Sequence, residues 1–342
     1  MSPLMQQLEA TAGFIQSKIS TKANTAIILG SGLGNLSSVI EADFSIPYNE
    51  IPNFPVSTVE GHKGRLILGT LNGKKVWVME GRFHFYEGYT AEQVVFPIRV
   101  LKLLGVENLL LSNAAGGVNK DYEVGDLMII KDHISFFTPN PLLGKNEPAL
   151  GTRFPDMSEP YANAFIDKAK RIAAEHQIKV HEGVYIGVTG PTFETRAEYQ
   201  LIKIAGGDVV GMSTVQENIA AVHCGMKVFA MSVVTDLGIR EDNNVITHEE
   251  VLAAANAAEQ TSLAARKWDE ERERLQEGIS DLNARIAALT QSADAEQAPL
   301  RTWWNMRRAV APSERRTHGD CAPGRQGGGP RAIQKNVACQ EF

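Results

Sequence analysis

Short apolar runs with few polar positions recur along the first two thirds of the chain. Such runs, rich in β-branched and long aliphatic residues, are typical of strands in a sheet that is covered on both faces. They are TAIIL at 25–29, LLLS at 109–112, DLMII at 126–130, DVVGMS at 208–213 and KVFAMSVVT at 227–235. A further pair of apolar segments, RLILGTLNGKKVWVME at 65–80, meets at Asn72-Gly73 and predicts a β-hairpin.

Helical segments with capping signals fall between these strands. The segment 90–105 begins with Thr90 and Gln93 in capping-box spacing, ends at Gly105 and contains Pro97, which predicts a bend. Three more capping boxes are expected, and they are Thr195 with Glu198, Ser213 with Gln216, and Thr247 with Glu250. Strands that alternate with capped helices predict an α/β fold, a single domain with a central, mostly parallel β-sheet flanked by helices.

The periodicity changes after about residue 258. Residues 259–291 predict a charged helix with a short coiled-coil seam, in which apolar residues from Leu275 to Leu289 recur in steps of four and three. Residues 292–342 are rich in Pro, Gly and Arg and predict a disordered basic tail. We therefore expect one domain over 1–258 and a C-terminal helical and disordered extension.

Composition narrows the classes of function. The chain of 342 residues carries a net charge of −6, although its last 42 residues hold eight Arg and Lys against three Asp and Glu. An acidic body argues against nucleic acid as the main partner.

The three cysteines are far apart, with no C-x-x-C, which favours a reducing cytoplasm over a disulfide framework. The sequence shows neither a membrane-length apolar run nor a secretory signal.

The first strand ends in a glycine-rich turn, GSGLG at 30–34. Its spacing is G-x-G-x-G, which differs from the G-x-G-x-x-G of dinucleotide sites, and no G-K-[ST] follows. Two interpretations stay open at this point: a tight turn without a ligand, or a small anion held by backbone N–H groups and the Ser31 hydroxyl.

A second candidate is EGRFHFYEGY at 80–89. If residues 82–86 are extended, alternation puts Arg82, His84 and Tyr86 on one face and Phe83 and Phe85 on the other. A guanidinium beside an imidazole forms a clamp for an anion, because the guanidinium pairs with two oxygens at once. This pattern favours an anion site over a plain edge strand.

Other polar side chains follow the predicted strands. Ser31, Asn113, Ser213 and Asp236 lie at or near strand carboxyl ends, where open α/β sheets bind ligands. The turn before the helix at 196 adds Phe193 and Glu194. Such a set suits a flat polar ring together with an anion.

Eight motifs, in this order, resemble the trimeric purine nucleoside phosphorylases. They are ILGSGLG, IPNFPVSTVEGHKGRL, EGRFHFYEGY, SNAAGG, RFPDMSEPY, GPTFET, VVGMSTV and THEEVLAAANAA. The resemblance covers residues 1 to about 258. It implies a mixed sheet and the phosphorolysis of purine (2′-deoxy)ribonucleosides to free base and (deoxy)ribose 1-phosphate. It also implies a homotrimer, no metal and no organic cofactor, with inorganic phosphate as co-substrate.

The resemblance also implies roles for individual residues. Phosphate would be held by Ser31, His62, Arg82, His84, the Ala114 backbone and Ser213. Ribose would contact Tyr86, Met212 and His248. The base would be surrounded by Asn113, Phe193, Glu194, Val210, Gly211 and Asp236, with Phe154 reaching into a neighbouring subunit's site. The catalytic groups would be His84, Glu194 and Asp236.

Asp236 departs from the family, where 6-oxopurine-specific members carry Asn. A carboxylate accepts from a 6-amino group but donates nothing to O6, whereas Glu194 suits the N1–H of hypoxanthine or guanine. We favour inosine and guanosine, with adenosine activity left open, and keep 5′-methylthioadenosine phosphorylase as the alternative. Two other classes, a nicotinamide-dependent enzyme and a scaffold or nucleic-acid binder built on the tail, rest on weaker signals.

Overall fold

The computed structural model of the chain describes residues 2–59, 62–239, 246–260, 280–281 and 284. The chain divides into two units, residues 1–270 and 271–342. The coiled-coil seam and the basic tail expected at 259–291 and 292–342 lie outside the described residues, apart from 259–260 and the three helical positions 280, 281 and 284. The fold below is that of the first unit.

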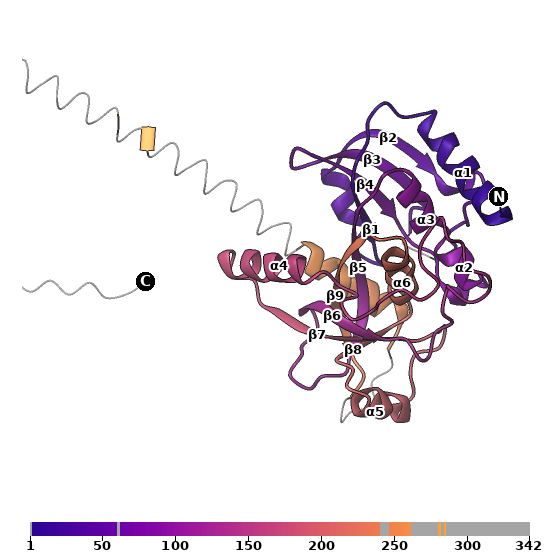
Figure 1. The fold of residues 1–342 in the computed structure, drawn as a ribbon. Coiled ribbons are helices and arrows are strands. Elements are labelled where there is room, and N and C mark those ends of the chain that lie inside the picture. Colours follow the sequence, from indigo (N-terminus) through magenta and orange to yellow (C-terminus); the bar gives the residue numbers. More distant parts are fainter. Residues whose placement is uncertain (1, 60–61, 240–245, 261–279, 282–283, 285–342) are drawn as a thin grey trace, which may run out of the picture. The chain divides into compact units, whose positions relative to one another are not determined.

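One mixed sheet organises the described part of this unit (Figure 1). Its nine strands lie in the order β2 (Glu41–Pro47), β3 (Arg65–Leu71), β4 (Lys74–Glu80), β1 (Thr25–Leu29), β5 (Asn108–Gly117), β8 (Val209–Gly211), β7 (Val180–Gly187), β6 (Leu127–Ile134) and β9 (Lys227–Leu237). Strand β9 also pairs with β5, so the second half of the sheet closes on itself. The long central strand β5 therefore belongs to both the open and the closed half.

The five apolar runs all form strands, as their pattern predicts. The predicted hairpin is also confirmed: β3 and β4 are antiparallel, and Asn72 and Gly73 have φ of 48° and 71°. Two central residues with positive φ give the type I′ geometry that matches the twist of the strands. The pairs β1–β4, β1–β5, β5–β9, β6–β7 and β7–β8 are parallel, and four others are antiparallel.

Helices cover the sheet. They are α1 (Pro3–Gln16), α2 (Ala91–Val94), α3 (Phe96–Leu103), α4 (Asn163–Glu175), α5 (Arg196–Ile204) and α6 (Val215–His223), with helical residues also at 248–260. The largest apolar core joins α1, α3 and α6 to one face of the strands, and Trp77 and Ile28 are fully buried in it. Helix α5 packs through Ile202 and Tyr199 on Ile186 and Val210, at the other end of the sheet (Figure 1).

Two helix predictions need correction. The segment 90–105 forms two helices, because the helix is interrupted at Val95. Pro97 lies in the first turn of α3, where the backbone N–H that proline lacks would have no partner within the helix. The capping box expected at Ser213 and Gln216 lies one residue later, at Thr214 and Glu217. The boxes that begin at Thr90, Thr195 and Thr247 are confirmed.

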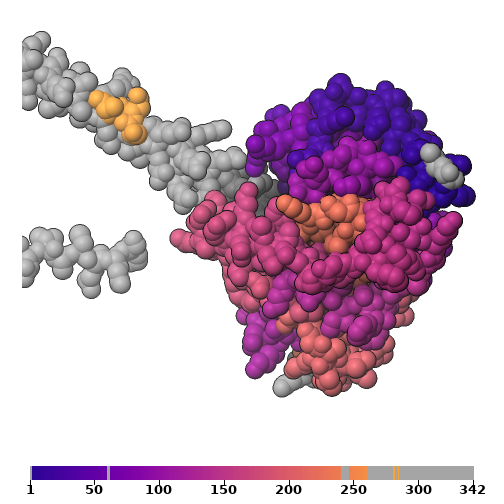
Figure 2. Space-filling model, in the orientation of Figure 1, coloured from indigo at the N-terminus to yellow at the C-terminus, as the bar shows by residue number. Residues whose placement is uncertain are grey.

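The glycine turn after β1 is shaped by close contacts. A Cβ on Gly30 would lie 2.7 Å from the carbonyl oxygen of Ser112 in β5. Gly32 has φ +73°, and a Cβ there would lie 2.6 Å from Ala255. The helical residues 248–260 therefore close over this turn, and Glu259 accepts hydrogen bonds from the backbone N–H groups that begin the short 3₁₀ helix η1 (Gly34–Val39). Figure 2 shows residues 246–260, in orange, between the indigo-to-purple and the pink parts of the surface.

Candidate functional site

A cavity of about 450 Å³ opens where β1, β8 and β9 end beside the middle of β5. A volume of this size suits a small organic ligand. The residues that line it are Ser31, Thr58, Val59, Arg82, His84, Tyr86, Glu87, Asn113, Ala114, Ala115, Gly116, Pro191, Phe193, Glu194, Tyr199, Val210, Gly211, Met212, Ser213, Thr235, Asp236, His248 and Val251. All the predicted site residues are among them, except His62 and Phe154.

The segment 82–86 reaches the cavity by a different route from the one expected. It is not an extended strand, since β4 ends at Glu80 and Phe85–Glu87 form a 3₁₀ turn, η3. The turn lets the His84 and Tyr86 rings stack with their centroids 4.6 Å apart. Phe83 is buried in the core as expected, whereas Phe85 is only half-buried.

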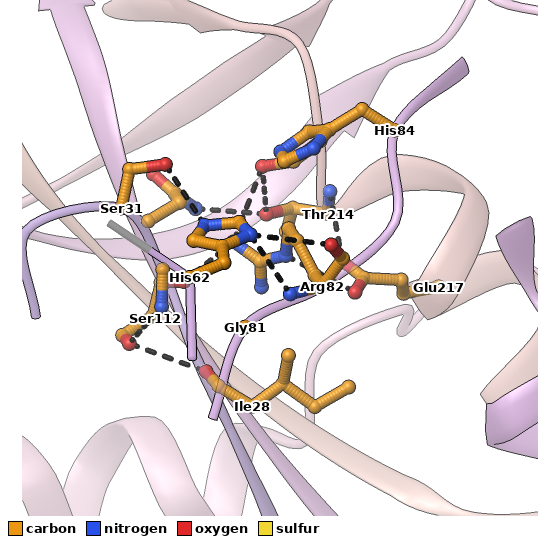
Figure 3. Close-up of polar contacts among 12 residues, drawn as sticks. Ile28, Ser31, His62, Gly81, Arg82, His84, Ser112, Thr214 and Glu217 are labelled. Carbon is orange, nitrogen blue, oxygen red and sulfur yellow. Dashed lines mark hydrogen bonds and ion pairs between the residues drawn. The ribbon is translucent and has the colours of Figure 1, made fainter. Parts of the chain in front are cut away.

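Arg82 is a buried cation at one end of the cavity, with its residue only 1% exposed (Figure 3). Its Nε donates to Glu217 Oε1 at 3.1 Å, and its Nη1 donates to the Ser112 carbonyl oxygen at 2.7 Å and to Ser213 Oγ at 3.4 Å. Its Nη2 is buried and has no hydrogen-bond partner among the described residues. A buried donor without a partner is costly, which points to an anion that completes the site.

Ser31 and His62 meet beside this arginine. Ser31 Oγ lies 3.1 Å from His62 Nε2, and His62 Nδ1 lies 3.2 Å from Ser57 Oγ (Figure 3). Burial lowers the pKa of His62, and the nearby His84 and Arg82 lower it further, to about 3. His62 is therefore neutral at pH 7. It does not line the cavity itself but touches Ser31, which does.

His84 is held by Glu87, a residue that the sequence did not single out. Glu87 Oε1 accepts from the His84 backbone N–H at 2.7 Å and lies 3.0 Å from His84 Nδ1. Burial lowers the pKa of His84 and outweighs the opposite effect of Glu87. Burial raises the pKa of Glu87, but hydrogen bonds from His84 and Thr58 reverse this and bring it to about 2. The sequence contains one signal for this pair, the spacing H-x-x-E in HFYE at 84–87.

The depressed pKa of His62 predicts a loss of stability in mild acid. An unfolded histidine titrates near 6.5, so the unfolded state binds a proton that the folded state refuses, and stability falls as the pH drops from 6.5 towards 3. His62→Gln should reduce the slope of the unfolding free energy against pH by up to about 1.4 kcal/mol per pH unit, the value for one proton. Denaturant unfolding between pH 6.5 and 5, above the range of Glu87, measures this slope.

The parent chain, unfolded over the same pH range, gives the reference slope. An unchanged slope in the His62→Gln variant would contradict the neutral, buried state of His62.

Carboxyl groups gather at the other end of the cavity. Asp236 is 6% exposed, and its Oδ1 accepts from Thr235 Oγ1 at 3.1 Å. Burial raises the pKa of Glu194; the hydrogen bond from Tyr199 lowers it and the charge of Asp236 raises it again. Asp236 Oδ2 and Tyr199 Oη both lie within 3.5 Å of the place that a Cβ on Gly116 would take. Gly116 thus leaves room for these groups to meet.

Asn113 is fixed at the centre of the site by Thr214. Its Nδ2 donates to Thr214 Oγ1 at 2.9 Å, and its Oδ1 has no hydrogen-bond partner among the described residues. The cavity therefore has a cationic end at Arg82, an acidic end at Glu194 and Asp236, and an amide between them. This arrangement suits a ligand with an anion at one end and a ring bearing N–H groups at the other.

Phe154 lies outside the cavity, and it is 85% exposed.

Among the described residues, no group of three or more His, Cys, Asp or Glu could hold a metal ion. No helix in the described part of the chain has the length and apolar character needed to cross a membrane.

Comparison with known proteins gives one consistent result. The family model described as "Phosphorylase superfamily" matches residues 24–266. A curated relative from Geobacillus stearothermophilus, named purine nucleoside phosphorylase 1, is 52% identical over 245 residues, which cover 72% of this chain and 89% of that protein. A solved structure of Schistosoma mansoni purine nucleoside phosphorylase with adenosine has a TM-score of 0.72 at 44% identity and covers 76% of this chain and 95% of that one. A solved structure of Schistosoma mansoni purine nucleoside phosphorylase with inosine matches at 43% identity and a TM-score of 0.72, and covers 76% of this chain and 94% of that one.

Proposed function

This chain belongs to the phosphorylase superfamily, and from that premise we propose that it is a purine nucleoside phosphorylase. It cleaves purine (2′-deoxy)ribonucleosides with inorganic phosphate and yields the free base and (deoxy)ribose 1-phosphate. The observation that carries this assignment is the buried Nη2 of Arg82, which has no hydrogen-bond partner in the described part of the chain and lies in a cavity whose far end holds two carboxyl groups. The reaction uses phosphate as co-substrate and needs neither a metal nor an organic cofactor.

Phosphate binds at the cationic end. The groups that hold it are the Arg82 guanidinium, the hydroxyls of Ser31 and Ser213, the His84 imidazole and the backbone of Ala114, and the His62 imidazole borders this set through its contact with Ser31. Two facts support this set: Ser213 Oγ already contacts Arg82 Nη1, and Ser31 Oγ contacts His62. Nη2 of Arg82, which has no hydrogen-bond partner among the described residues, can donate a charge-assisted hydrogen bond to a phosphate oxygen.

The nucleoside fills the rest of the cavity. Tyr86, Met212 and His248 contact the ribose, with His248 near the 5′-hydroxyl. The purine lies among Asn113, Phe193, Glu194, Val210, Gly211 and Asp236. Its ring packs on Phe193, which is 40% exposed and lines the cavity.

Charge development explains the catalysis. As the N-glycosidic bond breaks, C1′ becomes cationic and the purine becomes anionic. Phosphate held beneath the ribose, with His84 beside it, stabilises the cation. The departing base is neutralised when N7 takes up the proton that phosphate loses, and the Asp236 carboxylate accepts a hydrogen bond from this N7–H while Glu194 accepts from N1–H. These groups are in place before the reaction, because burial and neighbouring residues fix them.

The base class follows from the two carboxyl groups. Glu194 accepts from the N1–H of a 6-oxopurine, so inosine and guanosine are the favoured substrates, while Asp236 accepts from a 6-amino group and supports activity on adenosine. The alternative, 5′-methylthioadenosine phosphorylase, conflicts with His248 in the cavity wall, which would crowd a 5′-methylthio group. Phosphorolysis of inosine, adenosine and 5′-methylthioadenosine by one preparation tests this choice, and a strong preference for methylthioadenosine would overturn it.

The active assembly is a homotrimer in which Phe154 completes the site of a neighbouring subunit. An aromatic side chain that is 85% exposed supports this role, because it is stabilised when a partner covers it.

The cytoplasm is the proposed location. The wide spacing of the three cysteines, which suits a reducing compartment, is the support for this proposal.

Phe154→Ala should raise the KM for inosine by about tenfold, the typical effect of losing one well-packed aromatic contact. Steady-state kinetics with phosphate in excess measures this change, and size-exclusion chromatography reports the assembly. The control is Ile204→Ala on α5, another apolar residue that is highly exposed, at 82%. Equal KM values in the parent and both variants would refute the role of Phe154.

A further inference from the structure

Glu217 is a buried acid in the first turn of α6, and neither the family motifs nor the cavity wall include it. Glu217 is 4% exposed. Oε1 accepts from Arg82 Nε at 3.1 Å, and Oε2 accepts from the Thr214 backbone N–H at 3.0 Å (Figure 3). Each carboxylate oxygen thus has its own partner, and the two partners come from segments that are far apart in the sequence.

The contact with Arg82 fixes how the guanidinium is turned. Glu217 takes the Nε side of the group, and the Ser112 carbonyl oxygen and Ser213 Oγ take Nη1. Only Nη2 then lacks a partner among the described residues. Without Glu217, the planar group could rotate about its long side chain, and its buried charge would lose the carboxylate beside it.

The contact with Thr214 fixes the neighbouring turn. Thr214 has φ +69° and ψ −47°, a positive-φ conformation that is rare for a β-branched residue. Its N–H donates to Glu217, and its Oγ1 accepts from Asn113 Nδ2. These bonds hold a strained residue next to Ser213, whose hydroxyl contacts Arg82.

We propose that Glu217 is a positioning residue for phosphate: it orients the Arg82 guanidinium and, through Thr214, the Ser213 hydroxyl, so that both face the anion. The proposal rests on the proposed function in one respect, namely that the anion is phosphate. Glu217 does not touch the substrate. It acts through two residues that do.

Another capping box in the chain shows how to separate the two contacts. In the box at Thr90, Gln93 Oε1 accepts from the Thr90 N–H at 2.9 Å, as Glu217 Oε2 does from Thr214. Glutamine is therefore sufficient for the cap. In Glu217→Gln the amide oxygen keeps the cap, and its NH₂ group is turned towards Arg82 Nε, where two donors meet and no bond forms. The variant loses the orientation of Arg82 and retains the start of α6.

The test compares Glu217→Gln with the parent chain and with Glu198→Gln as a matched control. Glu198 occupies the same capping position in α5, with Thr195 as its partner, but it is exposed and lies outside the cavity wall. Glu217→Gln should raise the KM for phosphate by about tenfold or more, in line with a charge-assisted hydrogen bond, and change the KM for inosine by less than about threefold. Glu198→Gln should leave the KM for phosphate unchanged.

A second readout does not depend on turnover. Inorganic phosphate should raise the melting temperature of the parent chain and of Glu198→Gln, and Glu217→Gln should need about tenfold more phosphate for the same rise. If the parent chain fails to cleave inosine, the proposed function fails, and the phosphate-dependent melting shift still tests Glu217. The proposal is overturned if folded Glu217→Gln shows the parent's phosphate dependence, or if the KM values for phosphate and inosine rise together.

Discussion

Arg82→Ala raises the phosphate concentration needed for half-maximal rate by about a hundredfold or more, since each charge-assisted hydrogen bond from a guanidinium contributes roughly 1.5–3 kcal/mol. Arg82 is the cation whose Nη2 is buried without a partner among the described residues, and its other nitrogens are already engaged. The variant therefore removes the donors that only the anion can satisfy. Initial rates at saturating inosine over a wide range of phosphate concentrations measure the effect.

Removing Arg82 also leaves the Glu217 carboxylate buried without its counter-ion, which destabilises the fold by about 3–5 kcal/mol in comparable cases. Two milder variants separate folding from binding. Arg82→Lys keeps the charge but loses the planar fork, and should fall between the parent and Arg82→Ala. Ser31→Ala removes one hydroxyl at the half-buried edge of the site and should raise the KM for phosphate by a smaller factor. Parent-like phosphate dependence in all three would refute the clamp.

Asp236→Asn should increase the ratio of kcat/KM for inosine to that for adenosine by about tenfold or more. The amide accepts from N7–H and donates to O6 of hypoxanthine, whereas the carboxylate of Asp236 has no proton for O6 and accepts from the 6-amino group of adenine. Asp236 is buried in the cavity wall, so this exchange takes place away from bulk water, where an unmatched polar group is costly.

Asp208→Asn provides the matched control. Asp208 is a half-buried aspartate outside the cavity wall, bound to Asn119 Nδ2 and to the Val184 N–H. The same loss of one charge there should leave the ratio between the two substrates unchanged. A ratio that stays the same in Asp236→Asn, or that moves towards adenosine, would show that Asp236 does not read the 6-position.

The sheet shows which parts of the fold the sequence can predict. Apolar runs marked β1, β5, β6, β8 and β9, and Asn72-Gly73 marked the hairpin, because burial and turn chemistry are local properties. The strand β7 was missed although Tyr185 and Ile186 in it are buried, because polar residues and a glycine interrupt its apolar pattern. The pairing of β9 with β5, which closes half of the sheet, joins residues more than 100 positions apart and has no local signal. The mostly exposed β2 was not foreseen either, since its apolar content is low.

The site shows the same division. Residues at strand ends, such as Ser31, Ser213 and Asp236, could be grouped because the ends of buried strands meet at one place. The supporting acids were missed. Glu87 and Glu217 act by hydrogen bonds that depend on a local turn, and the cap at Thr214 uses a backbone conformation with positive φ that no periodicity indicates.

The most direct test of the account is the release of hypoxanthine from inosine by the purified full chain, with and without inorganic phosphate. We predict release only when phosphate is present, with one ribose 1-phosphate formed for each hypoxanthine. Release that proceeds equally well without phosphate and yields free ribose, or no release at any phosphate concentration, would contradict the assignment of the Arg82 end of the cavity to phosphate.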